Sequence, residues 1–163
     1  MQNPIKITIR TRDIIIALSG LEKASKGRGF SDHMTALRVG RTIRRLREVQ
    51  DEAEEAQRML VDAHAKRDAD GKVVEVGGRP GSVALEDMRE FNKESHALEL
   101  VEREVEVWPI AATAFATKGK KKAPNTCTEC GQLLGLPDAE PFAILVEYGI
   151  ILFDEENEEE DGA

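Results

Sequence analysis

Residues 31–67 read SDHMTALRVGRTIRRLREVQDEAEEAQRMLVDAHAKR, and this stretch decides the fold. Its small and apolar side chains recur every three or four positions, at Leu46, Val49, Ala53, Ala56, Leu60 and Ala63. This spacing is the heptad pattern of a helix that packs along another helix. Ser31 is the expected N-cap. The stretch therefore predicts one long, coiled-coil-like helix that runs from Ser31 to about Arg67.

A second helix is predicted to return along the first. Residues 84–100 carry a matching seam at Leu85, Met88, Phe91, Ser95 and Leu98, and Ser82 is the expected cap. Between the two helices lie an Asp-Gly turn at 70–71, the stretch 72–76 and the glycine-rich GGRPG at 77–81. The two seams and this connection predict an antiparallel helical hairpin.

Two strands are predicted at the base of the hairpin. Residues 5–10 and 104–108 alternate apolar and polar side chains. We expect them to pair antiparallel, with Ile7, Ile9, Val105 and Val107 toward the helices and with Lys6 and Arg10 across from glutamates.

Two shorter helices complete the expected fold, which is α+β and mostly α. Residues 11–25 favour a helix with Ile14, Ile15, Leu18 and Leu21 on one face, although three consecutive isoleucines keep a strand open. A C-terminal helix is expected from near Pro141, with Asp138 as its cap and Gly149 just after its end. The apolar residues 150–153 must pack against the rest of the chain.

Composition divides the chain into four parts. We expect a helical-hairpin domain with its base sheet at 1–112, a linker at 113–126 and a small C-terminal segment at 127–153. Residues 154–163, DEENEEEDGA, are an acidic tail that we expect to be disordered. The net charge of the whole chain is −8, and it is unevenly placed. Residues 123–163 hold 11 acidic and no basic side chains. Residues 1–122 therefore hold 23 basic and 20 acidic side chains, which give a net charge of +3.

The sequence contains no run of about 18 apolar residues, so we expect no membrane span. The N-terminal sequence also lacks the pattern of a secretory signal. Two cysteines in 163 residues do not suggest a disulfide framework. We expect a protein of a cytoplasm, which is also where virion components fold.

Cys127 and Cys130 have the CxxC spacing of a zinc knuckle. A structural zinc ion needs four ligands, and the three histidines, His33, His64 and His96, are expected on distant helices. A zinc site at this pair therefore needs ligands from another subunit or a distant histidine, and plain thiols are the simpler interpretation. No other cofactor is predicted.

The first half of the long helix is rich in arginine, including Arg38, Arg41 and Arg45, and Arg79 lies in the glycine-rich tip. These residues are candidate interaction sites, and the helix could contact phosphates. No aromatic residues are interleaved with the arginines and no nucleic-acid motif is present, which argues against a nucleic-acid partner. The sequence contains no catalytic motif, so we expect no enzyme activity.

The chain resembles a family of short phage and prophage proteins of unknown function. Asp70-Gly71, the Phe-Asn-Lys-Glu of 91–94 and the Glu-Val-Glu-Val of 104–107 carry the resemblance, which covers about residues 5–110. The cysteine pair and the acidic tail depart from the family pattern.

The resemblance implies a phage-encoded protein of the host cytoplasm or the virion that binds a protein partner. A structural or assembly-associated virion component is the favoured hypothesis. An accessory protein that inhibits a host factor, such as a defence nuclease, through its acidic tail as a nucleic-acid mimic is the alternative. Nucleic-acid binding through the arginine-rich helix is a weaker one. A second apolar edge at Val39, Ile43 and Met59 also allows homo-oligomers.

Overall fold

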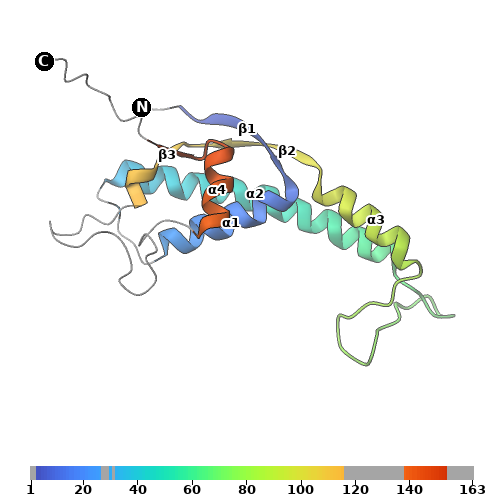
Figure 1. The fold of residues 1–163 in the computed structure, drawn as a ribbon. Coiled ribbons are helices and arrows are strands. Elements are labelled where there is room, and N and C mark those ends of the chain that lie inside the picture. The colour runs from blue at the N-terminus through green and yellow to red at the C-terminus, as the bar shows by residue number, and fades with distance from the viewer. Residues whose placement is uncertain (1–2, 27–29, 31, 116–137, 154–163) are drawn as a thin grey trace, which may run out of the picture.

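The computed structural model describes residues 3–26, 30, 32–115 and 138–153. Its elements follow the order β1 (Ile5–Arg10), α1 (Thr11–Ser25), α2 (His33–His64), α3 (Met88–Glu99), β2 (Glu102–Val107), β3 (Ile110–Ala111), a 3₁₀ helix η1 (Ala112–Phe115), α4 (Ala139–Glu147) and β4 (Ile151–Leu152). The hairpin of α2 and α3 and the antiparallel pair of β1 and β2 are present as predicted (Figure 1). The fold is α+β and mostly α.

The sheet of β1 and β2 has the predicted faces. Ile5 is opposite Val107 and Ile7 is opposite Val105, so the alternating apolar side chains share one face. Ile7, Ile9, Val105 and Val107 are all buried in the core. On the other face the Lys6 ammonium lies 2.8 Å from the Glu104 carboxylate, which confirms the predicted charge pairing for this lysine.

The core lies where α1 packs against α2 and α4. Ile14, Leu18 and Leu21 of α1 and Leu46 of α2 are buried in it. The prediction is wrong for Ile15, which is 49% exposed. Successive helical residues are rotated by about 100°, so Ile14 and its neighbour cannot both point into the same core.

A second sheet, which the sequence did not predict, joins the end of the described chain to the core. β3 and β4 run parallel, with Ile110 opposite Ile151, and both residues are buried. The packing expected for the apolar residues 150–153 is present for Ile150 and Ile151, which are buried, but the prediction is wrong for Leu152 and Phe153, which are 42% and 61% exposed.

The packed region also extends beyond the predicted limit of the hairpin domain. Phe115 is fully buried, so the linker expected at 113–126 does not begin before residue 116. Because α4 and β4 share the core with α1, residues 138–153 are part of the same packed unit. The rest of the predicted linker, Cys127, Cys130 and the acidic tail lie outside the described residues.

The long helix begins one residue later than predicted. Asp32, not Ser31, is the N-cap, and its carboxylate accepts hydrogen bonds from the Met34 N–H at 2.8 Å and the Thr35 N–H at 3.1 Å. The Thr35 hydroxyl also donates to it at 2.5 Å. These bonds favour the charged form, and the hydroxyl bond is the main reason why the pKa of Asp32 lies below its ordinary value.

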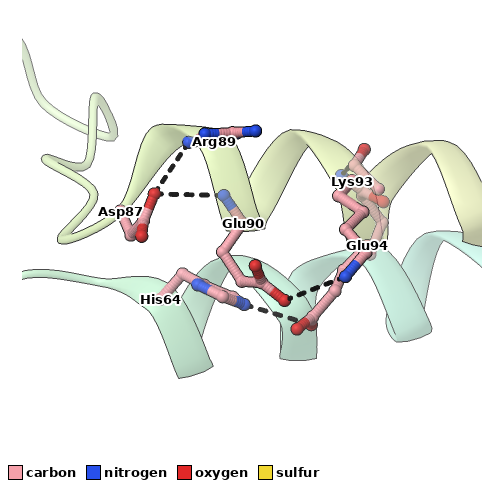
Figure 2. Close-up of polar contacts among 8 residues, drawn as sticks. His64, Asp87, Arg89, Glu90, Lys93 and Glu94 are labelled. Atoms are coloured by element: carbon pink, nitrogen blue, oxygen red, sulfur yellow. Dashed lines mark hydrogen bonds and ion pairs between the residues drawn. The ribbon is translucent and has the colours of Figure 1, made fainter.

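The connection between the two long helices is longer than predicted. α2 ends at His64, and α3 begins at Met88 with Asp87 as its N-cap, not at Ala84 with Ser82 as the cap (Figure 2). Asp87 accepts hydrogen bonds from the N–H groups of Arg89 and Glu90, at 2.9 and 3.1 Å. The three-four spacing of apolar residues continues into residues 84–87, so this spacing alone could not exclude them from the helix. In the structure they belong instead to the β-bridged segment before α3.

Residues 65–86 form what we call the distal ladder. Three short segments pair with one another through the bridges Ala65–Leu85, Arg67–Val73 and Glu75–Val83. The backbone N–H groups of Lys66, Val74 and Ala84 donate to the carbonyl groups of Ala84, Lys66 and Val74 in turn, so each segment bonds to the other two. Positive φ angles at Gly71, Gly77, Gly78 and Gly81 make the turns between them.

The distal ladder, α3 and the facing half of α2 form a distal arm that is less buried than the base. In the predicted seam of α2, Leu46 is buried, Ala63 is exposed and the four residues between them are half-buried. In the seam of α3, Phe91, Ser95 and Leu98 are half-buried, but Met88 is 59% exposed. His64 joins the two helices, with its Nε2 3.1 Å from the Glu94 carboxylate (Figure 2) and its ring edge-on to Phe91. Among the described residues no helix is long and apolar enough to cross a lipid bilayer.

Candidate functional site

An apolar groove lies where the beginning of α1 faces α2 and the end of α3. Its volume is about 400 Å³. The apolar members of its lining are Ile15, Ile16, Ala53, Ala56 and Leu98, and the charged members are Arg12, Glu54, Glu99 and Arg103. We refer to this site as the apolar groove.

The groove arises from the sizes and positions of its side chains. Ala53 and Ala56 leave this side of α2 without large side chains, because each has only a single methyl group. Ile15 reaches the groove because the turn of α1 directs Ile14, and not Ile15, into the core. The chain thus leaves a half-exposed isoleucine beside two small residues on α2.

Hydrogen bonds fix the walls of the groove. The backbone N–H and the hydroxyl of Thr11 both donate to the carbonyl oxygen of Val101 at 2.9 Å, which holds the start of α1 against the end of the hairpin. Arg103 donates to the Thr11 hydroxyl at 3.1 Å, and the Gln57 amide donates to the Ser95 hydroxyl at 3.1 Å across α2 and α3. Thr11, Gln57, Ser95 and Arg103 of the groove lining are therefore held in place by hydrogen bonds within the protein.

A cationic surface lies on α2 near the base, and we call it the arginine face. It consists of Arg38, Arg41, Arg44 and Arg45 of α2. The Arg41 guanidinium lies 5.5 Å from the centre of the Trp108 ring, a cation–π geometry. Arg41, Arg44, Arg45 and Trp108 line a hollow of about 180 Å³.

One carboxylate partly neutralises the arginine face. Glu48 accepts hydrogen bonds from Arg45 at 2.8 Å and from Arg44 at 3.2 Å. The hydrogen bond from Arg45 is the main reason why the pKa of Glu48 lies below its ordinary value. The single carboxylate of Glu48 thus bonds two of the guanidinium groups of this surface, those of Arg44 and Arg45.

The structure brings only some of the predicted interaction residues together. Arg38, Arg41 and Arg45 follow one side of α2, as their spacing of three and four requires. Arg79 lies instead in the distal ladder, where its N–H donates to the Val76 carbonyl at 3.4 Å. The segment between α2 and α3, which contains the distal ladder, lies at the end of the hairpin away from β1 and β2 (Figure 1). Arg79 therefore belongs to a different surface.

The predicted zinc ligands Cys127 and Cys130 lie outside the described residues. Within the described part of the chain no group of three or more His, Cys, Asp and Glu side chains could hold a metal ion. His33, His64 and His96 all lie on α2 and α3, as the sequence predicted.

Sequence reasoning missed Trp108 and the residues of the apolar groove. Trp108 is the only tryptophan of the chain, and a lone aromatic residue after a strand gave no sign that an arginine 67 positions earlier would stack on it. The run Ile14-Ile15-Ile16 did contain a signal, because three successive isoleucines on a helix leave at least one outside the core.

A comparison of the chain with protein-family models, with curated proteins and with solved structures finds no match.

Proposed function

We propose that this protein is a non-enzymatic interaction protein that takes an amphipathic helix of a partner protein into its apolar groove. The resemblance to short phage proteins supports a structural or assembly-associated role in a virion as the setting. The observation that carries the proposal is the groove itself, with half-exposed Ile15 beside Ala53 and Ala56.

The chemistry of the groove fits a helix as its occupant. Its lining comes from three helices, α1, α2 and α3, and from the beginning of β2. A helix that adds its apolar stripe to such a surface inserts side chains spaced three or four residues apart. The small side chains of α2 allow a close approach, and both charge signs on the lining can pair with the polar edges of an amphipathic helix.

The polar groups of the groove favour binding over catalysis. The Ser95 hydroxyl accepts its hydrogen bond from the Gln57 amide, which is not a base, and the Thr11 hydroxyl donates to a backbone carbonyl. A nucleophile needs an adjacent general base. Neither hydroxyl has one among its described partners.

A photo-crosslinker tests this proposal. Benzoylphenylalanine at position 15 places the reactive group in the groove, and the same residue at position 59 is the matched control, because Met59 is 66% exposed and does not line the groove. Irradiation of the cells that naturally express the protein should give one discrete adduct at position 15 and none at position 59. Ala53→Arg, which fills the groove, should abolish the adduct.

The same adduct at both positions, or an adduct at position 15 that survives Ala53→Arg, would contradict the groove as the binding site. An adduct of twice the chain mass would identify the partner as a second copy. Detection of the protein in purified virus particles tests the virion setting separately.

The alternatives use other surfaces. The cation–π pair of Arg41 and Trp108 supports nucleic-acid binding by the arginine face, which a salt-dependent gel shift would detect. Inhibition of a host factor would rest on the acidic residues 154–163, and their deletion should then abolish capture of that factor.

A further inference from the structure

The backbone hydrogen bonds of β2 alternate between its two edges. In an antiparallel pair every second residue bonds to the neighbouring strand, and the residues between them point their N–H and C=O groups away from it. The Thr11 N–H donates to the Val101 carbonyl at 2.9 Å, and these two residues continue the register that pairs Ile9 with Arg103. The odd-numbered residues of β2 therefore bond to β1, and the even-numbered residues face the outer edge.

The even-numbered residues of β2 form an open edge. The N–H and C=O groups of Glu102, Glu104 and Glu106 point away from β1 and have no hydrogen-bond partner among the described residues. Trp108 continues the same alternation, since its N–H and C=O groups are the ones that bond to the Thr42 hydroxyl. α2 thus closes this edge at Trp108 and not at the three glutamates before it. We call these three glutamates the β2 edge.

The side chains of the β2 edge are all acidic and share one face of the sheet, because alternate residues of a strand point to the same side. The buried valines of β2 occupy the other face, toward the helices along which the sheet lies (Figure 1). Glu102 and Glu104 are exposed and Glu106 is half-buried. The Lys6 ammonium pairs with Glu104 at 2.8 Å, but both side chains of this pair are largely exposed. A strand added here meets carboxylates on one face and extends an apolar layer on the other.

We propose that the β2 edge binds an extended segment of a partner protein in which basic and apolar residues alternate. The segment adds antiparallel to β2 as a third strand, with its Lys or Arg side chains opposite the three glutamates. Main-chain bonds to an open edge supply affinity, and cross-strand pairs of opposite charge select the basic segment. The edge of β1 repels the same segment, because Lys6 and Arg10 lie on one face of that strand.

This inference is separate from the proposed function. The apolar groove takes a helix, and none of the three glutamates of the β2 edge lines it. The two sites can therefore be tested one at a time.

The synthetic peptide TVKVRVKT is the probe for the β2 edge. In the antiparallel register its three basic residues lie opposite Glu106, Glu104 and Glu102 in turn. Fluorescence anisotropy of the labelled peptide should show binding to the full-length protein. The peptide TVEVEVET is the matched control and should bind at least about tenfold more weakly, because three attractive cross-strand pairs become repulsive.

Methylation of the peptide backbone tests the main-chain pairing. In an antiparallel pair, the peptide residues opposite the glutamates direct their own N–H groups at β2. N-methylation of the Lys and Arg residues should therefore abolish binding. N-methylation of the valines, whose N–H groups point to solvent, should leave the dissociation constant within about threefold.

Two substitutions at position 104 separate the carboxylate from the backbone. Glu104→Ala keeps the outward N–H and should weaken binding by no more than about fivefold, the value of one cross-strand ion pair. Glu104→Pro also removes this N–H and should abolish binding. Because the N–H does not bond to β1, proline is compatible with the pairing of β1 and β2. Thermal unfolding followed by circular dichroism checks that both variants are folded.

Amide exchange locates the bound peptide residue by residue. In the free protein the amides of Glu102, Glu104 and Glu106 should exchange faster than those of Val105 and Val107, which bond to β1. Saturating TVKVRVKT should slow exchange of the three glutamate amides at least about tenfold. NMR spectroscopy of the isotope-labelled full-length protein measures each of these rates.

Several results would overturn the proposal. They are slow exchange of the three glutamate amides in the free protein, equal binding of the two methylated peptides, and undiminished binding to a folded Glu104→Pro variant. Loss of peptide binding in Ala53→Arg, without slower exchange at the β2 edge, would place the peptide in the apolar groove instead. None of these results changes the crosslinking expected at position 15, so failure here is distinguishable from failure of the proposed function.

Discussion

The hydroxyl of Thr42 shows how one residue holds the sheet to the long helix. Thr42 is fully buried on α2, and its Oγ1 both accepts from the Trp108 N–H at 3.0 Å and donates to the Trp108 carbonyl oxygen at 3.2 Å. The two bonds satisfy the backbone of the residue that follows β2. They also fix the backbone of Trp108, the residue on whose ring Arg41 stacks.

Thr42→Val should therefore destabilise the protein by about 1–3 kcal/mol, because it leaves the N–H and C=O groups of Trp108 without their partner. Thr42→Ser is the control, since it keeps the hydroxyl and removes one methyl group, at a cost of about 1 kcal/mol. Urea denaturation followed by circular dichroism measures both changes in the free energy of unfolding. A Val variant as stable as the natural protein would contradict a role for these bonds.

At the scale of elements, α4 is attached to α1 by polar contacts at both ends. The Tyr148 hydroxyl donates to the Asp13 carboxylate at 2.6 Å, and the Lys23 ammonium donates to the Asp138 carboxylate, also at 2.6 Å. The Asp138 side chain makes no capping hydrogen bond at the start of α4, although Asp138 is the N-cap residue, as predicted. Its pairing with Lys23 helps to hold α4 on α1.

The contact of Tyr148 gives a pH dependence with a definite sign. Burial, and then the hydrogen bond to Asp13, raise the pKa of Tyr148 above its ordinary value. The folded protein therefore keeps the proton in a pH range where the unfolded chain has lost it. The resulting stability is fully present below the unfolded pKa of about 10, and it is lost as the pH rises through the folded pKa.

Tyr148→Phe should thus cost about 1 kcal/mol at pH 8, through the lost hydrogen bond, and progressively less as the pH rises above 10. Urea denaturation of both proteins between pH 8 and pH 11 measures this difference. The Glu104 contact also raises the pKa of Lys6, but Lys6 is present in both proteins, so its contribution cancels in the difference.

Because Tyr148 is the only tyrosine, its ultraviolet absorbance reports its titration directly. A midpoint at or below about 10, the ordinary value, would refute the effect of the Asp13 contact.

At the scale of the whole molecule, burial is uneven. Six residues of α1 are buried, whereas α3 has none. The large buried side chains belong to the base, where both sheets and α1, α2 and α4 meet, while the distal arm relies on half-buried contacts such as His64 with Phe91. Local stability should follow this distribution.

Hydrogen exchange should therefore be faster in the distal arm than in the base. We expect the amides of α3 to exchange at least about tenfold faster than those of β1 and α1, because few buried contacts oppose local opening. Exchange measured by mass spectrometry on peptides from 88–99 and 5–25 tests this expectation. Equal protection of the two regions would mean that the arm and the base unfold as one unit.

The sequence predicted the elements whose signals are local. The heptad spacing of α2, the alternation in β1 and β2, and the positive φ of Gly149 after α4 were all readable from neighbouring residues. The start of α3 could not be read in this way. Leu85 and Met88 continue the helical spacing that leads to Phe91, but Leu85 is bridged to Ala65 in the distal ladder. Helical periodicity cannot exclude a β-bridge that depends on a segment 20 residues away.

What the sequence by itself determined is thus the hairpin, its base sheet and the charge pattern, since periodicity and composition encode them. Tertiary structure alone decided the pairing of β3 with β4, the apolar groove and the stacking of Arg41 on Trp108. Each of these joins residues far apart in the chain, as do the bonds of Thr42 to Trp108 and of Asp13 to Tyr148, 66 and 135 positions apart. The physical reason is that such contacts depend on how the elements pack, which no local pattern of side chains specifies.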